Sequence, residues 1–320
     1  MTDFFTVLAG VAAIAGAQDA VQTPQTAPTQ LGDVVVTARA TTDTARRFVG
    51  RVAAPARGRG LARWRKVCPG VANLDRASAQ PIVDRIAVTA ADLGIEVEGM
   101  GCEANIIVVF TADAAAVTRA MIENNPRVFR GEGGGIDRGG AALRAFRDSD
   151  RPVRWWSLSV PIDSETGQRA IRIPGDLAGG SVDAVTAATL GCNPEDCAFA
   201  GAPIVQSTTA SRLSSQIVDQ IYKSIVIVDI DSVSGLNTTQ LGDYLAFVSL
   251  SQVDPEADTS AFDTVLNLFE NPEGVLGLTA WDRSYLYALY NSPSRRRTVG
   301  GQANAVASIM NRTAASEPVE

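Results

Sequence analysis

The chain has 320 residues, of which 46% are hydrophobic and 20% are charged, so it can bury a substantial core. It contains no histidine, which excludes Ser-His-Asp and Cys-His catalysis, an HExxH zinc helix and a histidine-ligated haem. The net charge of −7 argues against a general nucleic-acid-binding protein, since phosphate recognition needs a cationic surface.

An apolar run at residues 4–16 leads into Ala15-Gly16-Ala17, which has the small-x-small form of a signal-peptidase site. The run is too short to span a bilayer stably. It predicts a signal peptide over residues 1–17 and an exported mature chain without a transmembrane span. The alternative is a frayed apolar N-terminus.

Residues 18–60 are rich in polar residues, proline, alanine, arginine and glycine, which predicts a disordered, basic arm. Nine cationic side chains and one acid lie between Arg39 and Lys66, whereas residues 241–290 hold eight acids and one arginine. A solvated basic linker beside an acidic face explains this pattern. Alternatively, the two segments attract each other, or the arm rests on an anionic membrane surface.

One β-prone run lies within the arm, at residues 33–39. It is similar to the TonB box near the N-terminus of outer-membrane TonB-dependent receptors, which pairs as an added strand with the energising protein. The resemblance implies a strand that captures an envelope partner, with these residues in contact: Asp33, Val34, Val35, Val36 and Thr37. An ordinary edge strand or a linker is the alternative, and no β-barrel pattern follows.

A single globular α/β domain is predicted over residues 61–320. Periodicity and capping residues predict, in order, a strand at 67–74, a helix at 79–93, a strand at 105–111 and a helix at 113–124. The glycine-rich loop at 131–140 lacks the spacing of a phosphate-binding loop. A hairpin of strands at 153–162 and 169–173 follows.

The rest of the domain begins with a long excursion at residues 174–203. Beyond it we expect a helix at 209–222, a strand at 224–231, and helices at 238–252, 261–270, 279–290 and 302–312. A capping box from Thr279 to Asp282 opens the third of these last helices. Alternating strands and helices with one hairpin predict an α/β (α+β) fold with a mixed sheet.

The four cysteines predict two disulfides. Cys68 and Cys102 each stand beside an expected strand, and Cys192 and Cys197 bracket a short turn-rich segment. We therefore expect Cys68 to pair with Cys102 and Cys192 with Cys197, in an oxidising compartment. The separations do not match a CxxC zinc site.

Carboxylates are the remaining candidates for chemistry. Asp229 and Asp231 share one face at the end of an expected strand, where they could act as acid and base or hold a divalent metal. The alternative is a strand that simply exits into solvent. Asp254, Glu256 and Asp258 have the spacing that opens a calcium loop, but no glycine or glutamate completes an EF-hand.

The segment from Ile225 to Tyr290 resembles zincin-like exported proteins of Gram-negative bacteria that are grouped as domains of unknown function. The resemblance covers the strand, a helix with Asp243-Tyr244-Leu245-Ala246-Phe247, the acidic turn and the Leu-Thr-x-x-Asp helix, and it extends loosely over about 206–312. In a zincin, HExxH supplies two metal ligands and the general base. The resemblance implies that Asp243, Tyr244 and Phe247 stand where HExxH has its two ligands and its general base. Val253 stands where a third ligand would be.

These observations predict an exported, non-catalytic binding or scaffolding protein of the cell envelope, resembling a pseudoenzyme. It is expected in the periplasm or at the outer membrane, with a protein partner, no nucleic acid and no cofactor, as an accessory of an outer-membrane or TonB-linked complex. The alternative is a periplasmic hydrolase that uses a divalent metal with Asp229, Asp231 and Asp243.

Overall fold

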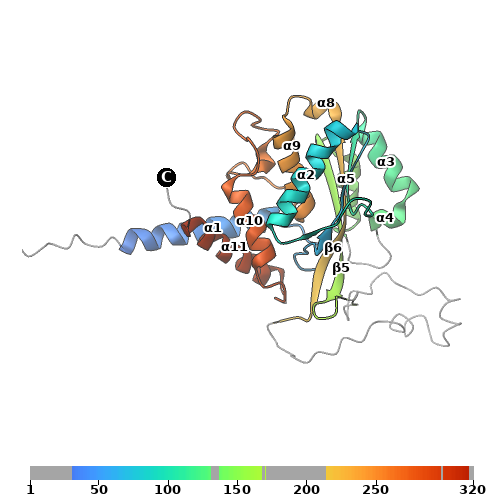
Figure 1. Cartoon of the computed structure of the whole chain (residues 1–320). Helices are drawn as coiled ribbons and strands as arrows, with labels where there is room; N and C mark the ends of the chain where they lie inside the picture. The colour runs from blue at the N-terminus through green and yellow to red at the C-terminus, as the bar shows by residue number, and fades with distance from the viewer. Residues whose placement is uncertain (1–30, 131–136, 168–169, 171–213, 297, 317–320) are drawn as a thin grey trace, which may run out of the picture.

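A mixed sheet with helices on both faces organises the protein (Figure 1). The computed structural model describes residues 31–130, 137–167, 170, 214–296 and 298–316. The main sheet has the order β2 (Pro69–Ala72), β4 (Ile106–Thr111), β6 (Ile217–Asp229) and β5 (Val153–Asp163). The first three strands are parallel, and β5 runs antiparallel to β6. This confirms the predicted α/β fold with a mixed sheet.

Successive residues of β6 point to opposite faces of the sheet and enter two hydrophobic clusters. Val226 and Val228 join the larger cluster, and Ile225 and Ile227 join the smaller one. The larger cluster includes residues from α2 (Arg76–Asp92), α9 (Thr238–Leu250) and α10 (Ala280–Asn291). The smaller cluster is covered by α3 (Ala114–Asn124), α4 (Pro126–Arg130) and α5 (Gly140–Asp148).

The basic N-terminal segment differs most from its prediction. It forms a long helix, α1 (Leu31–Val52), so the strand expected at 33–39 is wrong, and residues Asp33 to Thr37 lie in a helix. Ala45, Phe48, Val49 and Val52 recur at helical spacing and are fully buried. This apolar stripe overrides the local β-propensity of the valines. The fold therefore begins well before residue 61.

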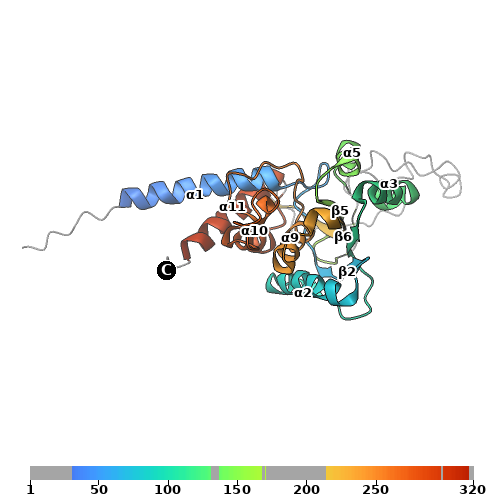
Figure 2. The ribbon, with the colours of Figure 1, turned by 90° about the horizontal axis from the view of Figure 1, so that it is seen from above.

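Helix α1 packs against α11 (Val299–Ser316) near the C-terminus, and Figure 2 shows its first turns extending beyond the body of the protein. The basic and acidic segments also meet. Arg51 lies 3.1 Å from a carboxylate oxygen of Asp258, and Arg63 donates to the carbonyl of Tyr290 at 3.4 Å. Of these contacts, the exposed Arg51–Asp258 ion pair agrees with attraction between the two segments.

Most predicted elements on either side of the sheet are confirmed. Helix α2 begins at Arg76, three residues before its expected start, because Asp75 accepts hydrogen bonds from the amides of Ala77 and Ser78. Asp113 caps α3 as predicted. Strand β4 and helices α9, α10 and α11 form where the sequence places them.

Other elements differ from their predictions. Strand β6 starts at Ile217, inside the helix expected at 209–222, because residues four apart also share one face of a strand and pairing with β5 favours the strand. Helix α5 was not predicted. Only a short 3₁₀ turn, η1 (Val265–Asn267), forms in the helix expected at 261–270. The expected elements at 169–173 and 174–203 lie outside the described residues, apart from Ala170.

The first predicted disulfide is present. Cys68, between β1 (Lys66–Val67) and β2, is bonded to Cys102, and their Cα atoms are 6.1 Å apart. Strand β1 pairs in parallel with β3 (Glu96–Val97), which brings the two cysteine-bearing segments together. Cys192 and Cys197 lie outside the described residues. None of the helices in the described ranges is both long and apolar enough to cross a membrane.

Candidate functional site

The two aspartates at the end of β6 do not form a pair. The strand ends at Asp229, whose carboxylate caps the short helix α8 (Ile230–Val233) by accepting from the amide of Ser232 at 3.1 Å. Asp231 lies in that helix and is exposed. Because the chain turns into a helix at residue 230, the shared strand face expected for these carboxylates is absent.

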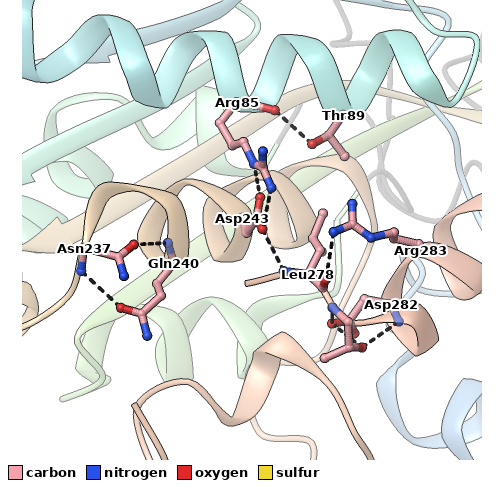
Figure 3. Close-up of polar contacts among 9 residues, drawn as sticks. Arg85, Thr89, Asn237, Gln240, Asp243, Leu278, Asp282 and Arg283 are labelled. Atoms are coloured by element: carbon pink, nitrogen blue, oxygen red, sulfur yellow. Dashed lines mark hydrogen bonds and ion pairs between the residues drawn. The ribbon is translucent and has the colours of Figure 1, made fainter. Parts of the chain in front are cut away.

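Asp243 is buried at the contact between α9 and α2. Both its oxygens form an ion pair with the guanidinium of Arg85, one contact measuring 2.8 Å, and it also accepts from the amide of Leu278 at 2.7 Å (Figure 3). The aspartate is 1% exposed. Its hydrogen bond to Arg85 raises the pKa of that guanidinium. Asp243 therefore joins three parts of the fold.

The helix that carries Asp243 is buried along most of its length. An Asn237–Gln240 capping box begins α9, and every residue from Gln240 to Leu250 is buried. Phe247 packs against Tyr285 in the larger cluster, and the carbonyl of Val253 accepts from the indole of Trp155 at 2.9 Å. Phe247 and Val253, two positions to which the zincin resemblance pointed, thus make packing and hydrogen-bond contacts within the fold.

The three carboxylates considered for calcium diverge to separate arginines. Asp254 lies 2.8 Å from Arg138, Glu256 3.4 Å from Arg151, and Asp258 3.1 Å from Arg51. Within the described ranges, no group of three acids or cysteines is placed to share a metal ion. The alternating sequence spacing was therefore misleading, because each of these side chains contacts a different element.

A polar cleft of about 610 Å³ lies between α9, the start of β5 and the segment 254–275. Aromatic and charged side chains line it, including Arg151, Trp155, Tyr244, Phe262, Asp263 and Glu270. Thr259 and Asn267 stabilise the segment from within, since the threonine hydroxyl donates to the asparagine at 2.7 Å. The cleft has the size and mixed lining of a ligand-binding site.

Tyr244 is the functional candidate that sequence reasoning missed. Its ring packs edge-on against Trp155 and Phe269, with centroids 6.1 and 5.0 Å away. The residue is 3% exposed, yet its hydroxyl has no hydrogen-bond partner among the described residues. A tyrosine within an apolar helical run was the only signal in the sequence, and an ordinary core residue gives the same signal.

Asp282 ties the middle of the segment that forms the cleft to the start of α10. Its carboxylate accepts from the hydroxyl of Thr264 at 2.6 Å and from the amides of Val265 and Thr279 at 2.7 and 3.1 Å. The predicted Thr279–Asp282 capping box is confirmed. Burial raises the pKa of Asp282 to about 6, against hydrogen bonds that lower it.

Two buried structural aspartates thus hold the segment that forms the cleft, and Tyr244 in its lining has no hydrogen bond to its hydroxyl among the described residues. Comparisons with protein-family models, with curated proteins and with solved structures found no match to this chain.

Proposed function

We propose that the protein is an exported, non-catalytic binding or scaffolding protein of the cell envelope, and that the cleft beside Tyr244 is its binding surface. The observation that carries this proposal is Tyr244, which lines the cleft of about 610 Å³ and whose hydroxyl has no hydrogen-bond partner among the described residues. The hydroxyl is not one of the fully buried polar atoms without a partner, so water can reach it, and a ligand in the cleft can take the place of that water.

The other candidate carboxylates support binding over hydrolysis. Asp229 caps a helix and Asp243 is bonded to Arg85 and to the amide of Leu278. An acid or base needs a side chain free to exchange a proton with a substrate. Asp243 is 1% exposed and paired, Asp229 caps a helix, and Asp231 is exposed in that short helix, so the three carboxylates do not converge on one site.

Export is supported by two independent features. The N-terminal apolar run ends in a small-x-small site, and the Cys68–Cys102 disulfide is a bond that persists in oxidising compartments. Since the segment 33–39 is helical, we no longer propose that it adds a strand to a partner.

Filling the cleft tests the proposal. We expect Ser260→Trp, at an exposed position in the cleft, to abolish retention of an envelope-extract component on the immobilised full chain. Ser78→Trp is the matched control, because Ser78 also is exposed and donates to a preceding aspartate but lies on α2. Equal retention by both variants would contradict a binding role for the cleft.

The same proteins separate the hydrolase alternative from the proposal. Hydrolysis of peptide, ester or phosphoester substrates that depends on added magnesium or calcium, and that is lost in Asp229→Asn while the melting temperature is unchanged, would favour an enzyme. We expect no such activity above the background of the Asp229→Asn variant.

A further inference from the structure

The charges around the cleft do not cancel. Asp254, Glu256 and Asp258 each have an arginine within 4 Å. Asp263 and Glu270 also line the cleft, and neither forms an ion pair or a side-chain hydrogen bond with any described residue. The lining therefore has two uncompensated negative charges, which favour a cationic ligand.

Tyr244 lines the same cleft as these two acids. Burial raises the pKa of Tyr244 well above its ordinary value, while the nearby charges of Arg151 lower it and those of Glu270 raise it. Tyr244, Arg151 and Glu270 all line the cleft. The group stays protonated at neutral pH and offers a hydrogen bond beside an unpaired carboxylate.

The arrangement suits an organic cation better than a metal ion. A hard metal ion needs several oxygens converging within about 2.6 Å, and the carboxylates here lie on different parts of the segment. An ammonium or guanidinium group instead donates several directed hydrogen bonds, and its methylene stem packs on aromatic faces. Phe262, which is only partly buried, is an aromatic residue of the lining.

We propose that the cleft binds a primary amine or guanidinium group, which donates to Glu270 and to the oxygen of Tyr244 while its stem lies along the aromatic residues. This inference rests on the proposed function and names the ligand class of the same site. The group belongs either to a lysine or arginine side chain of a partner or to a free aliphatic amine.

Calorimetric titration of the full chain distinguishes these sources. The probes are N-acetyl-lysine methylamide, N-acetyl-arginine methylamide and cadaverine, with N-acetyl-norleucine methylamide as the uncharged control. We expect saturable binding of the cationic probes at millimolar concentration and none of the norleucine probe. Preference for the amino-acid probes indicates a partner side chain, and preference for cadaverine indicates a free amine.

Two isosteric variants test the residues. Tyr244→Phe removes only the hydroxyl, and we expect about a tenfold loss of affinity because the lost hydrogen bond involves a charged group. Glu270→Gln removes an exposed charge, and we expect a loss of about two- to fivefold. Glu273→Gln is the matched control, since Glu273 is an exposed acid of the same segment outside the lining, and we expect unchanged affinity.

The outcomes separate this inference from the proposed function. If no cationic probe binds, or if Glu273→Gln weakens binding as much as Glu270→Gln, the cation inference is wrong. If Ser260→Trp still abolishes retention of the envelope component in that case, the cleft remains the binding surface for a ligand of other chemistry. Loss of probe binding in Ser260→Trp together with unchanged envelope retention contradicts the proposed function alone.

Discussion

Two irregular regions of the protein are held in place by different chemistry. The loop before β4 is attached to the sheet by the Cys68–Cys102 disulfide and by Asn105, whose side chain accepts from the amide of Cys68 at 2.8 Å. The segment 251–279 has little regular structure and is held by the buried carboxylates of Asp243 and Asp282. The first region depends on redox conditions and the second on pH.

Asp243 and Asp282, the two buried carboxylates that hold the segment 251–279, also differ in their surroundings. Asp243 has a cation, Arg85, whereas Asp282 has hydrogen-bond donors but no positively charged partner among the described residues. A buried carboxylate without a counter-ion favours its protonated form. The pH dependence of this region is therefore expected from Asp282, whose pKa burial raises.

Removing the disulfide has the largest expected effect. We expect the double variant Cys68→Ser, Cys102→Ser to lose about 4 kcal/mol of unfolding free energy, because the bond closes a long loop in the unfolded chain. Denaturant unfolding with and without reductant measures this. The loss of unfolding free energy should be the same at pH 5 and pH 7. A strongly pH-dependent loss would contradict the distinction between a region held by a disulfide and a region held by carboxylates.

Titration of Asp282 gives the next largest effect. Its pKa is raised to about 6 from 3.8, so the folded state binds this proton more tightly than the unfolded chain does. The free energy of unfolding should therefore rise by up to about 3 kcal/mol as the pH falls through this range. This contribution is lost as the pH rises through 6.

The difference between wild type and Asp282→Asn isolates that proton. Asp75→Asn is a control of opposite sign, because hydrogen bonds from Ser78 lower the pKa of Asp75 and its contribution is lost at low pH. If the difference in unfolding free energy between wild type and Asp282→Asn does not change between pH 4 and pH 7, the hydrogen bonds donated to Asp282 offset the effect of burial on its pKa.

Removal of Arg85 tests the ion-paired end. Arg85→Ala leaves Asp243 buried without its cation, which costs 3–5 kcal/mol in fully buried pairs. The Arg85 side chain is 35% exposed, so water screens the pair and we expect about 2 kcal/mol. Chemical denaturation measures it, with Arg76→Ala, at an exposed residue of the same helix α2, as the comparison. If both variants lower the free energy of unfolding equally, the ion pair between Arg85 and Asp243 contributes little to stability.

The smallest effect concerns the close approach at Gly277. A Cβ atom there would collide with the carboxylate of Asp243 that accepts from Leu278. We expect Gly277→Ala to cost about 1 kcal/mol, since the segment must shift to relieve the contact. Gly235→Ala is the control because nothing lies near its Cβ position. Thermal melting should therefore separate the two variants.

The sequence predicted those elements whose local signals agree with their packing. The caps Asp113 and Thr279 mark α3 and α10, and the apolar run of β4 matches a buried parallel strand. The Cys68–Cys102 pair was also predicted, because both cysteines stand beside strands that meet in one part of the sheet. The candidate site was only partly predicted, since the zincin resemblance pointed to Asp243 and the calcium-loop spacing to Asp254, but neither indicated their partners.

Local patterns in the sequence were enough to predict the mixed α/β architecture and the positions of most helices, and the absence of histidine excludes histidine-based chemistry. Long-range contacts were needed to establish that the basic arm is a helix, that β6 begins at Ile217, and that Arg85 pairs with Asp243 across two helices. The two kinds of information act over different distances along the chain. Caps and periodicity act within a few residues, whereas the burial of Phe48 and the unused hydroxyl of Tyr244 depend on residues far apart in the chain.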